Sequence, residues 1–238
     1  MAMGYATLSF GTMPEAALWN KRCGELGFVE LFSSIRLHTP ANDIRSFFGK
    51  RADWVLMTGH SGGRDLYGDT MPPFLQFETN STIGIMEDGS KDFKKLTVLD
   101  PNSEAFQMKS VKVLFFTGCC IFIEKWVLEM LRRIFGNPVI LGTVFLTGHG
   151  YTHTMFDGLN ESNPGFFKRY AANGGDPVAA WMETARTIYG GALPDAKHPI
   201  IAPDGRRISA EENFRALDTS GQEWMIRDKK LIKNRVIP

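Results

Sequence analysis

Two apolar runs of this sequence are each followed by a residue that can take part in catalysis. Residues 54–58 lead to His60, and residues 111–116 lead to Cys119. Each run has the composition of a buried strand, and in an open parallel sheet ligands bind just beyond the carboxyl ends of the strands. Neighbouring strands lie about 5 Å apart, so an imidazole and a thiol at adjacent strand ends can face each other. The pattern predicts a catalytic cysteine–histidine pair at this edge of the sheet.

Apolar spacing predicts strands and helices that alternate along most of the chain. The clearest helix follows the cysteines, where apolar residues recur at helical spacing up to Ile134, and this helix is expected to begin near Phe122. Strands on both sides make it a parallel crossover unit. We therefore predict an α/β fold, a three-layer αβα sandwich with a mainly parallel central sheet. The other expected elements are strands at 5–10, 29–37 and 139–146 and helices at 14–26, 166–172 and 177–189, with a short helix that carries Ile44, Phe47 and Phe48.

A long segment, residues 64–110, interrupts this alternation and is rich in Gly, Pro, Asp and Ser. Within it, apolar residues around Ile83 and Val98 flank the turn pair Asp88-Gly89. Two apolar segments joined by such a turn predict a β-hairpin, which we place on the rim of the sheet.

The length and composition fit one domain with a large core. The chain has 238 residues, 43% of them hydrophobic. We expect the α/β domain over residues 1–190, with 191–238 as a C-terminal extension that packs on this domain or trails from it. The basic stretch 227–235 near the end is expected to be a solvated tail.

Charge, cysteine content and hydropathy limit the partners and the compartment. Lys and Arg together number 27 and Asp and Glu 26, so the charge balance gives no pull toward nucleic acid or an anionic membrane. No run approaches the roughly 18 apolar residues of a membrane span, and the first residues lack a secretory signal pattern. Three cysteines, two of them adjacent, favour a reducing compartment. We expect a soluble, cytoplasmic protein without nucleic acid or membrane as a partner.

Two histidines stand at a spacing that a metal site could use. His149 and His153 are four residues apart and could share one face of a helix. No cysteine or acidic pair at ligand spacing accompanies them, so we expect neither a metal nor a cofactor.

The order of these motifs is similar to that of the caspase-like cysteine peptidases of clan CD, and most of all to their bacterial caspase-like and separase-like branch. In that branch a hydrophobic strand leads to SGHGG and a later one to SAC. The matching stretches here are Thr58-Gly59-His60-Ser61-Gly62-Gly63 and Thr117-Gly118-Cys119. The strand around Gly142 and the alanine-rich helix around Ala180 are also similar, so the resemblance spans about residues 5 to 190.

The resemblance implies a cysteine endopeptidase that cuts a peptide or protein substrate through a thioester acyl-enzyme. A thiol attacks only as thiolate, so Cys119 needs the imidazole of His60 or a helix N-terminus beside it. His60 serves as general acid and base, and backbone N–H groups of Cys119 and of Ser61 or Gly62 hold the oxyanion. Cys119 is favoured over Cys120, which would begin the following turn. A regulatory partner, self-association or loop cleavage would control activity.

The sequence departs from the family pattern at two positions. Ser61 stands where glycine usually follows the histidine, and Gly118 stands where alanine is common. Neither change removes a backbone donor, but the first alters the expected geometry of the oxyanion site.

Two other hypotheses use the same residues. Gly59-His60-Ser61-Gly62-Gly63 also matches G-x-S-x-G, the nucleophile elbow of α/β-hydrolases, in which Ser61 would be the nucleophile of an esterase. The elbow must lead straight into a helix, and the glycine and prolines that follow argue against one. The third hypothesis is a catalytically inactive caspase-like interaction module.

The residue that the enzyme would recognise before the scissile bond is poorly defined by the sequence, and no substrate-binding residue is assigned. Asp65, Asp69, Asp100 and Asp157 lie on predicted loops that could border the cleft. Their negative charge favours a basic side chain at this position.

Overall fold

The computed structural model describes the elements that form the core and most of their connections. The described residues are 2–10, 13–36, 41–59, 61–63, 75–78, 82–86, 96–117, 122, 125–144, 149–189 and 209–238.

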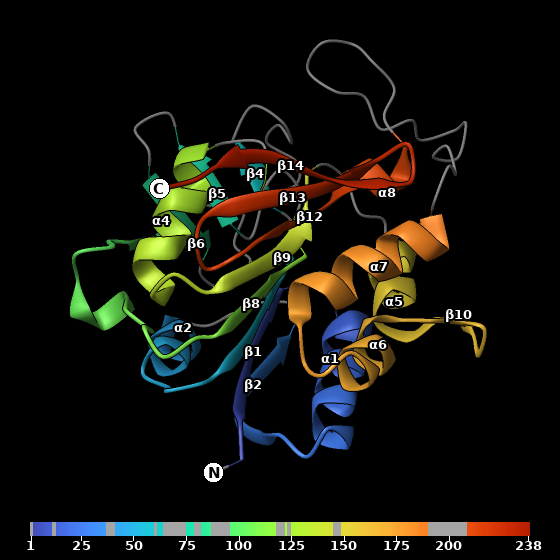
Figure 1. The fold of residues 1–238 in the computed structure, drawn as a ribbon. Coiled ribbons are helices and arrows are strands. Elements are labelled where there is room, and N and C mark those ends of the chain that lie inside the picture. Colours follow the sequence, from blue (N-terminus) through green and yellow to red (C-terminus); the bar gives the residue numbers. More distant parts are fainter. Residues whose placement is uncertain are drawn as a thin grey trace.

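An eight-stranded mixed sheet forms the centre of the molecule, with the order β14-β13-β12-β9-β8-β3-β1-β2 (Figure 1). Five of its strands are parallel to one another, and β12 joins them antiparallel to β9 and begins an antiparallel extension. The parallel strands are β1 (Gly4–Phe10), β2 (Val29–Arg36), β3 (Trp54–Thr58), β8 (Val113–Phe116) and β9 (Val139–Thr143). The antiparallel strands are β12 (Phe214–Leu217), β13 (Gln222–Arg227) and β14 (Lys230–Val236).

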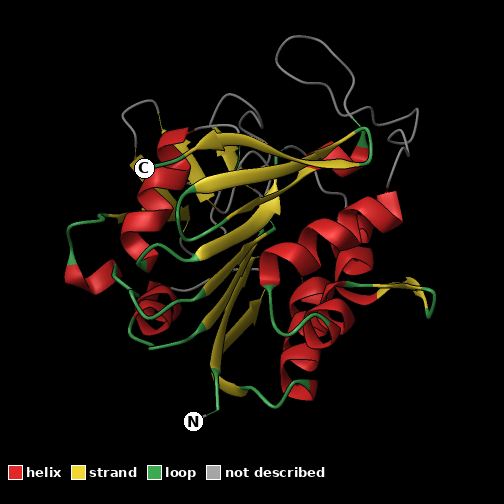
Figure 2. Cartoon of the chain, in the orientation of Figure 1, coloured by secondary structure: helices red, strands yellow, loops and turns green. Residues whose placement is uncertain are grey.

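Helices cover both faces of this sheet, as the colouring in Figure 2 makes clear. One face packs against α2 (Ala41–Phe48) and α4 (Lys125–Phe135). The other packs against α1 (Met13–Glu25), α5 (His149–Asp157), α6 (Phe166–Ala172) and α7 (Pro177–Tyr189). The expectation of an α/β fold with a mostly parallel central sheet is confirmed, and its layers are compatible with a three-layer sandwich. No helix in the described part of the chain is both long and apolar enough to span a membrane.

Helix α4 shows why local spacing predicts these elements well. Its buried side chains include Val127, Leu131 and Ile134, whereas Lys125 and Arg133 are exposed. This single apolar face fits a helix that lies on a sheet. The helix begins at Lys125 and not near Phe122, so the expected start is wrong by about one turn.

Aromatic side chains fix α6 and α7 on the opposite face of the sheet. The ring of Trp54 lies 5.5 Å from that of Phe115 and 6.0 Å from that of Phe166, and Phe115 lies 6.0 Å from Trp181. All four side chains are almost fully buried. Edge-to-face and tilted ring pairs of this kind pack densely, so they hold the two helices firmly against β3 and β8.

The basic C-terminal stretch is a strand and not a solvated tail. β13 and β14 pair from Arg227↔Lys230 to Gln222↔Val236, which makes β14 the outermost described strand on this side of the sheet. The two turn residues, Asp228 and Lys229, have φ angles of 52° and 61°. Positive φ at both positions defines the turn whose twist suits a two-residue hairpin. This turn lacks the usual Asn-Gly or Asp-Gly pair, and the charged strand lacks apolar alternation.

The excursion after β3 forms a second, four-stranded sheet with the order β4-β5-β6-β7. The strands are β4 (Ser61–Gly63), β5 (Leu75–Glu78), β6 (Thr82–Met86) and β7 (Leu96–Leu99). The predicted hairpin is confirmed, because β6 and β7 pair antiparallel from Ile83↔Leu99 to Met86↔Leu96. Its predicted turn, Asp88-Gly89, lies outside the described residues. The strands β4 and β5 extend the hairpin beyond what the apolar pattern indicates.

A short strand pair, a 3-10 turn and a one-turn helix complete the described chain. A short two-stranded pair is formed by β10 (Gly158–Asn160) and β11 (Asn163–Pro164), and a single 3-10 turn is η2 (Glu104–Phe106). The one-turn helix α8 (Ala210–Asn213) leads directly into β12. Residues 214–236 therefore belong to the same sheet as the strands of the first 190 residues.

Candidate active site

The order in which successive strands join the sheet changes side at β1, between β1 and β3. From β1 it passes through α1 to β2 on one side, and then through α2 to β3 on the other side of β1. In an open α/β sheet, ligands bind at the carboxyl ends of the strands where such a reversal occurs. Gly59 follows β3 at this point, and His60 is the next residue of the sequence. The topology therefore marks the carboxyl end of β3 as a candidate site.

A row of buried hydroxyl groups runs across the carboxyl edge of the parallel strands. Ser9, Thr58, Thr117 and Thr143 are at most 7% exposed. Ser9 pairs with Thr58 directly, and Thr117 and Thr143 follow in register beyond the last pairs of β3–β8 and β8–β9. Residues in register on parallel strands point to the same face. The four hydroxyl groups thus form one polar row at the carboxyl ends of β1, β3, β8 and β9, next to the apolar core.

One contact in this row joins the ends of β3 and β8. Thr117 Oγ1 donates a hydrogen bond to Thr58 Oγ1 over 2.6 Å, and the Thr117 backbone N–H donates to the Met57 carbonyl over 3.2 Å. A hydrogen bond between two buried hydroxyls contributes to stability, since loss of one hydroxyl removes a partner from the other in a place that water does not reach. These two residues immediately precede Gly59-His60 and Gly118-Cys119.

We expect this hydroxyl pair to show energetic coupling. Thr58→Val or Thr117→Val should each lower the free energy of unfolding by about 1 kcal/mol, because each change leaves a buried hydroxyl with a lost partner. The double variant should lose less than the sum of the two single losses, as measured in urea unfolding of all four proteins. Losses that simply add would contradict the contact.

The predicted catalytic residues themselves, His60, Cys119 and Cys120, lie outside the described residues. The predicted oxyanion donors Ser61 and Gly62 lie in β4, which pairs in parallel with β5 through Ser61↔Leu75 and Gly62↔Gln76. Within the described sheet β4 is an edge strand. Successive backbone N–H groups of a strand point to opposite sides, so only one of these two can face β5.

The same strand bears on the nucleophile-elbow hypothesis. An elbow serine lies on a sharp turn between a strand and a helix, where its hydroxyl is exposed. Ser61 instead lies at the start of a strand, and the next two residues continue that strand. The described backbone from Ser61 to Gly63 is therefore extended, whereas a helix would follow the serine of an elbow of that type.

Phe122, three residues after Cys119, is held from three directions. Its N–H donates to the Thr143 carbonyl over 3.4 Å, and its carbonyl accepts from Arg235 Nη2 over 2.6 Å. Its ring is 2% exposed and lies against Gly142, where an added Cβ would come within 3.2 Å of the ring. The segment that carries the two cysteines thus ends at a fixed point.

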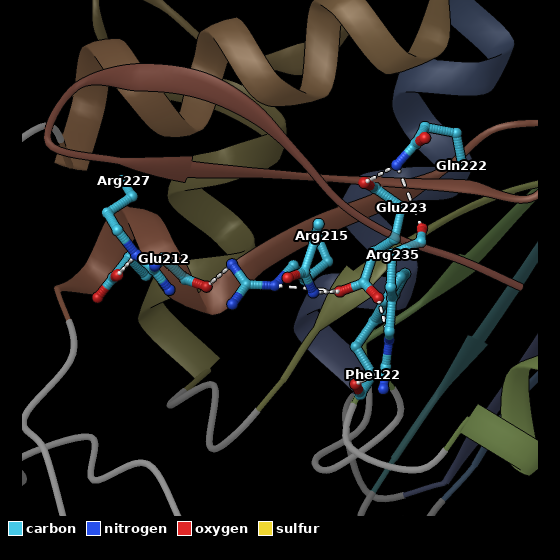
Figure 3. A network of polar contacts seen from close by, with 8 residues as sticks. Phe122, Glu212, Arg215, Gln222, Glu223, Arg227 and Arg235 are labelled. Carbon is cyan, nitrogen blue, oxygen red and sulfur yellow. Dashed lines mark hydrogen bonds and ion pairs between the residues drawn. The ribbon is translucent and has the colours of Figure 1, made fainter. Parts of the chain in front are cut away.

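The arginine that holds Phe122 belongs to a buried ionic network between α8 and the C-terminal hairpin (Figure 3). Glu223, 1% exposed, accepts from Arg235 Nε over 2.5 Å and lies 3.4 Å from Arg215 Nε. Arg215 also donates to the Glu212 carbonyl, and Glu212 pairs with Arg227 over 2.8 Å. Burial lowers the pKa of the Arg215 guanidinium to about 10, while the nearby carboxylates oppose this shift.

Two of the acidic residues considered for substrate recognition lie away from the carboxyl edge. Asp157 pairs with Arg22 over 2.6 Å near the end of α1, the end that leads into the start of β2. Asp100 accepts from the Asn102 N–H, and Asn102 in turn accepts from Arg133 near the end of α4, close to the start of β9. The expectation that these two border the cleft is wrong, because Arg22 and Arg133 lie near the amino ends of the strands, at the edge opposite the candidate site. Asp65 and Asp69 lie outside the described residues.

Cys23 shows the environment of a structural thiol. It lies on α1 with no exposed surface, and burial raises the pKa of its thiol well above the usual range. A thiol that stays protonated is a poor nucleophile, so Cys23 is an internal reference for cysteine reactivity.

The two histidines at metal-ligand spacing do share one helix, since α5 spans His149–Asp157. His153 is exposed. Among the described residues, no group of three or more His, Cys, Asp and Glu side chains could hold a metal ion.

Comparisons of the chain with protein-family models, with curated proteins and with solved structures each found no match.

Sequence reasoning missed the polar groups that frame the candidate site. The hydroxyl pair has a signal that a search could use, because Thr-Gly occurs at the end of both apolar runs, as Thr58-Gly59 and Thr117-Gly118. Glu212 of the ionic network also caps the start of α8 together with Ser209, and this pair is visible in the sequence as S-x-x-E. The contact between Arg235 and Phe122 joins residues 113 positions apart and leaves no local signal.

Proposed function

We propose that this protein is a cysteine endopeptidase of the caspase-like type, with Cys119 as the nucleophile and His60 as the general acid and base. The observation that carries the proposal is the register between β3 and β8. Every pair from Trp54↔Val113 to Met57↔Phe116 joins residues 59 positions apart, as does the Thr58–Thr117 hydrogen bond. His60 and Cys119 are also 59 positions apart.

The shared separation of 59 residues is a physical reason to expect His60 and Cys119 close together. Each member follows its threonine by two residues, with one glycine between, so the two connections have equal length. Two residues extend the chain by at most about 7 Å, which limits how far either side chain can stray from the threonine pair. Because both connections are this short and leave adjacent strands about 5 Å apart, the imidazole of His60 and the thiol of Cys119 can meet just beyond the two strand ends.

The backbone N–H groups of Ser61 and Gly62 are suited to hold the oxyanion, because both residues closely follow His60 in the sequence. One of the N–H groups of Ser61 and Gly62 points away from β5, because neighbouring N–H groups of a strand alternate. Such a donor, together with the N–H of Cys119, would stabilise the negative charge that develops on the carbonyl oxygen. This supports the choice of Ser61 or Gly62, and the serine at 61 contributes only its backbone.

The reaction follows from these roles. The Cys119 thiolate attacks the peptide carbonyl carbon, and His60 gives its proton to the leaving amine as the carbon–nitrogen bond breaks. The thioester that remains is attacked by a water molecule that His60 deprotonates. Breakage of the carbon–sulfur bond then releases the new carboxyl group and restores the thiolate and imidazolium. A free thiolate needs a reducing compartment, which favours the cytoplasm.

Chemical labelling tests this proposal without knowledge of the substrate. Iodoacetamide followed by peptide mapping should modify Cys119 at least about 10-fold faster than Cys23, because a thiolate reacts and a buried thiol does not. A peptidyl fluoromethyl ketone should label the same residue. Faster labelling of Cys120 would move the nucleophile by one position, and labelling of Ser61 by a fluorophosphonate would support the esterase. Inertness of all of these would support an interaction module without catalysis.

A further inference from the structure

We propose that Arg235, oriented by Glu223, is a positioning residue for the segment that carries Cys119, and that the C-terminal hairpin is therefore part of the catalytic apparatus. This inference rests on the proposed function. It assigns Arg235 no contact with substrate, since the residue acts through the Phe122 carbonyl.

The cysteine segment is fixed at both ends by contacts of different origin. At its start Thr117 is bound to β3 through Thr58 Oγ1 and the Met57 carbonyl, over 2.6 and 3.2 Å. At its end the carbonyl of Phe122 is bound to Arg235 over 2.6 Å. Only residues 118–121 separate these two anchors. A span this short has few conformations left when both ends are fixed, so a loosened anchor changes the position of the thiol.

Arg235 is suited to this task because its guanidinium makes two bonds in different directions. Nε donates to Glu223 Oε2 over 2.5 Å, and Nη2 donates to the Phe122 carbonyl over 2.6 Å. A planar fork that is held by one group presents its other donors at a fixed angle. A lysine in its place would carry the charge on a single flexible ammonium and could not hold both partners in this geometry.

Glu223 is itself fixed by its neighbours and so provides a rigid support. Its carboxylate also accepts from Asn234 Nδ2 over 3.0 Å and lies 3.4 Å from Arg215 Nε, and the residue is 1% exposed. Figure 3 shows the carboxylate of Glu223 between the guanidinium groups of Arg215 and Arg235, with Phe122 beyond Arg235. Because Arg215 comes from β12, the support reaches from the outer hairpin into the interior of the sheet.

The experiment compares Arg235→Ala and Arg235→Lys with a control on the same strand, Lys233→Ala. Lys233 is exposed, and its Nζ lies 5.3 Å from the centre of the Trp224 ring. We expect Arg235→Ala to lower kcat for peptide cleavage by about 10- to 100-fold with KM changed less than about 3-fold, because misplacement of the thiol affects the reacting geometry. The pH profile of Cys119 alkylation should shift as well. Arg235→Lys should recover only part of kcat, and Lys233→Ala should match the wild type.

A measurement that does not depend on activity separates this inference from the proposed function. Amide hydrogen exchange of a peptide that covers residues 117–122 should be at least about 10-fold faster in Arg235→Ala than in Lys233→Ala. Unchanged exchange and unchanged kcat would overturn the positioning role even if the wild type cleaves peptides. Faster exchange in a protein whose wild type shows no thiol reactivity would support the anchor and refute the peptidase. If Arg235→Ala fails to fold, the same two measurements on Arg235→Lys test the positioning role.

Discussion

Cys119→Ala is expected to lower kcat/KM for peptide cleavage by at least about 10³-fold, because it removes the atom that forms the acyl-enzyme. His60→Ala should lower it by about 10²- to 10⁴-fold, the usual contribution of a positioned acid and base. The double variant should be no slower than the worse single variant, since a nucleophile and its base act as one unit. The measurement uses a mixture of fluorogenic peptides with acidic, basic or asparagine residues before the scissile bond.

Two control variants make this test specific to one thiol. Cys23→Ala removes a buried thiol whose pKa is raised by burial, so kcat/KM should stay close to the wild type. Cys120→Ala removes the thiol that directly follows Cys119 in the sequence. Retained activity in Cys119→Ala with loss in Cys120→Ala would assign the nucleophile to position 120. Activity in both variants would refute the cysteine mechanism.

Most of the framework of the fold can be predicted from local sequence, because each parallel strand and the helices α1, α2, α4, α6 and α7 carry their own pattern. Helix α5 (His149–Asp157) was not among the predicted elements. The predicted helices 166–172 and 177–189 agree with α6 and α7 at both ends. Gly165 precedes the first, and Asp176 and Pro177 mark the start of the second, where Asp176 Oδ1 accepts from the Ala179 N–H. Elements with apolar faces and clear end signals are set by interactions within a few residues.

Elements that depend on distant pairing were not predictable in the same way. β4 is Ser-Gly-Gly and has no apolar residue, and it exists as a strand through its pairing with β5. Most residues of β14 are exposed and three of its seven are basic, so its composition resembles that of a tail, and its position comes from the ladder with β13. Composition reports whether a side chain prefers water, but a strand is held by backbone hydrogen bonds, which every residue except proline can both donate and accept.

The residues of the candidate site also fall into a group that local sequence predicts and a group that it does not. Its chemical residues, His60 and Cys119, stand out in the sequence because they follow apolar runs at equal distances from Thr-Gly pairs. Its supporting residues do not, because a glutamate or an arginine reads as a surface residue until a partner is known. The partner of Arg235 at Phe122 is 113 residues away. Residues that support a site from a distance are therefore the part that needed a structure.

Glu223→Gln is expected to lower the free energy of unfolding by about 3–5 kcal/mol, the usual cost when one partner of a buried ion pair is removed. The variant keeps the size of the side chain but removes the carboxylate that forms an ion pair with Arg215, whose side chain is 9% exposed. Since small proteins are stable by only about 5–15 kcal/mol, this loss is a large share of the total. Urea unfolding followed by circular dichroism measures the change.

Two comparisons show whether the cost comes from an uncompensated charge. Glu25→Gln removes an exposed carboxylate that lies 2.5 Å from Arg22, and it should cost less than about 1 kcal/mol because water replaces the lost partner. The double variant Arg215→Met/Glu223→Leu removes both buried charges and should recover most of the stability that Glu223→Gln loses. A double variant that is as unstable as Glu223→Gln would instead assign the cost to lost packing and to the released Arg235. In that outcome Glu223 stabilises the sheet through its contacts with Asn234 and Arg235 of β14 and not through neutralisation of Arg215.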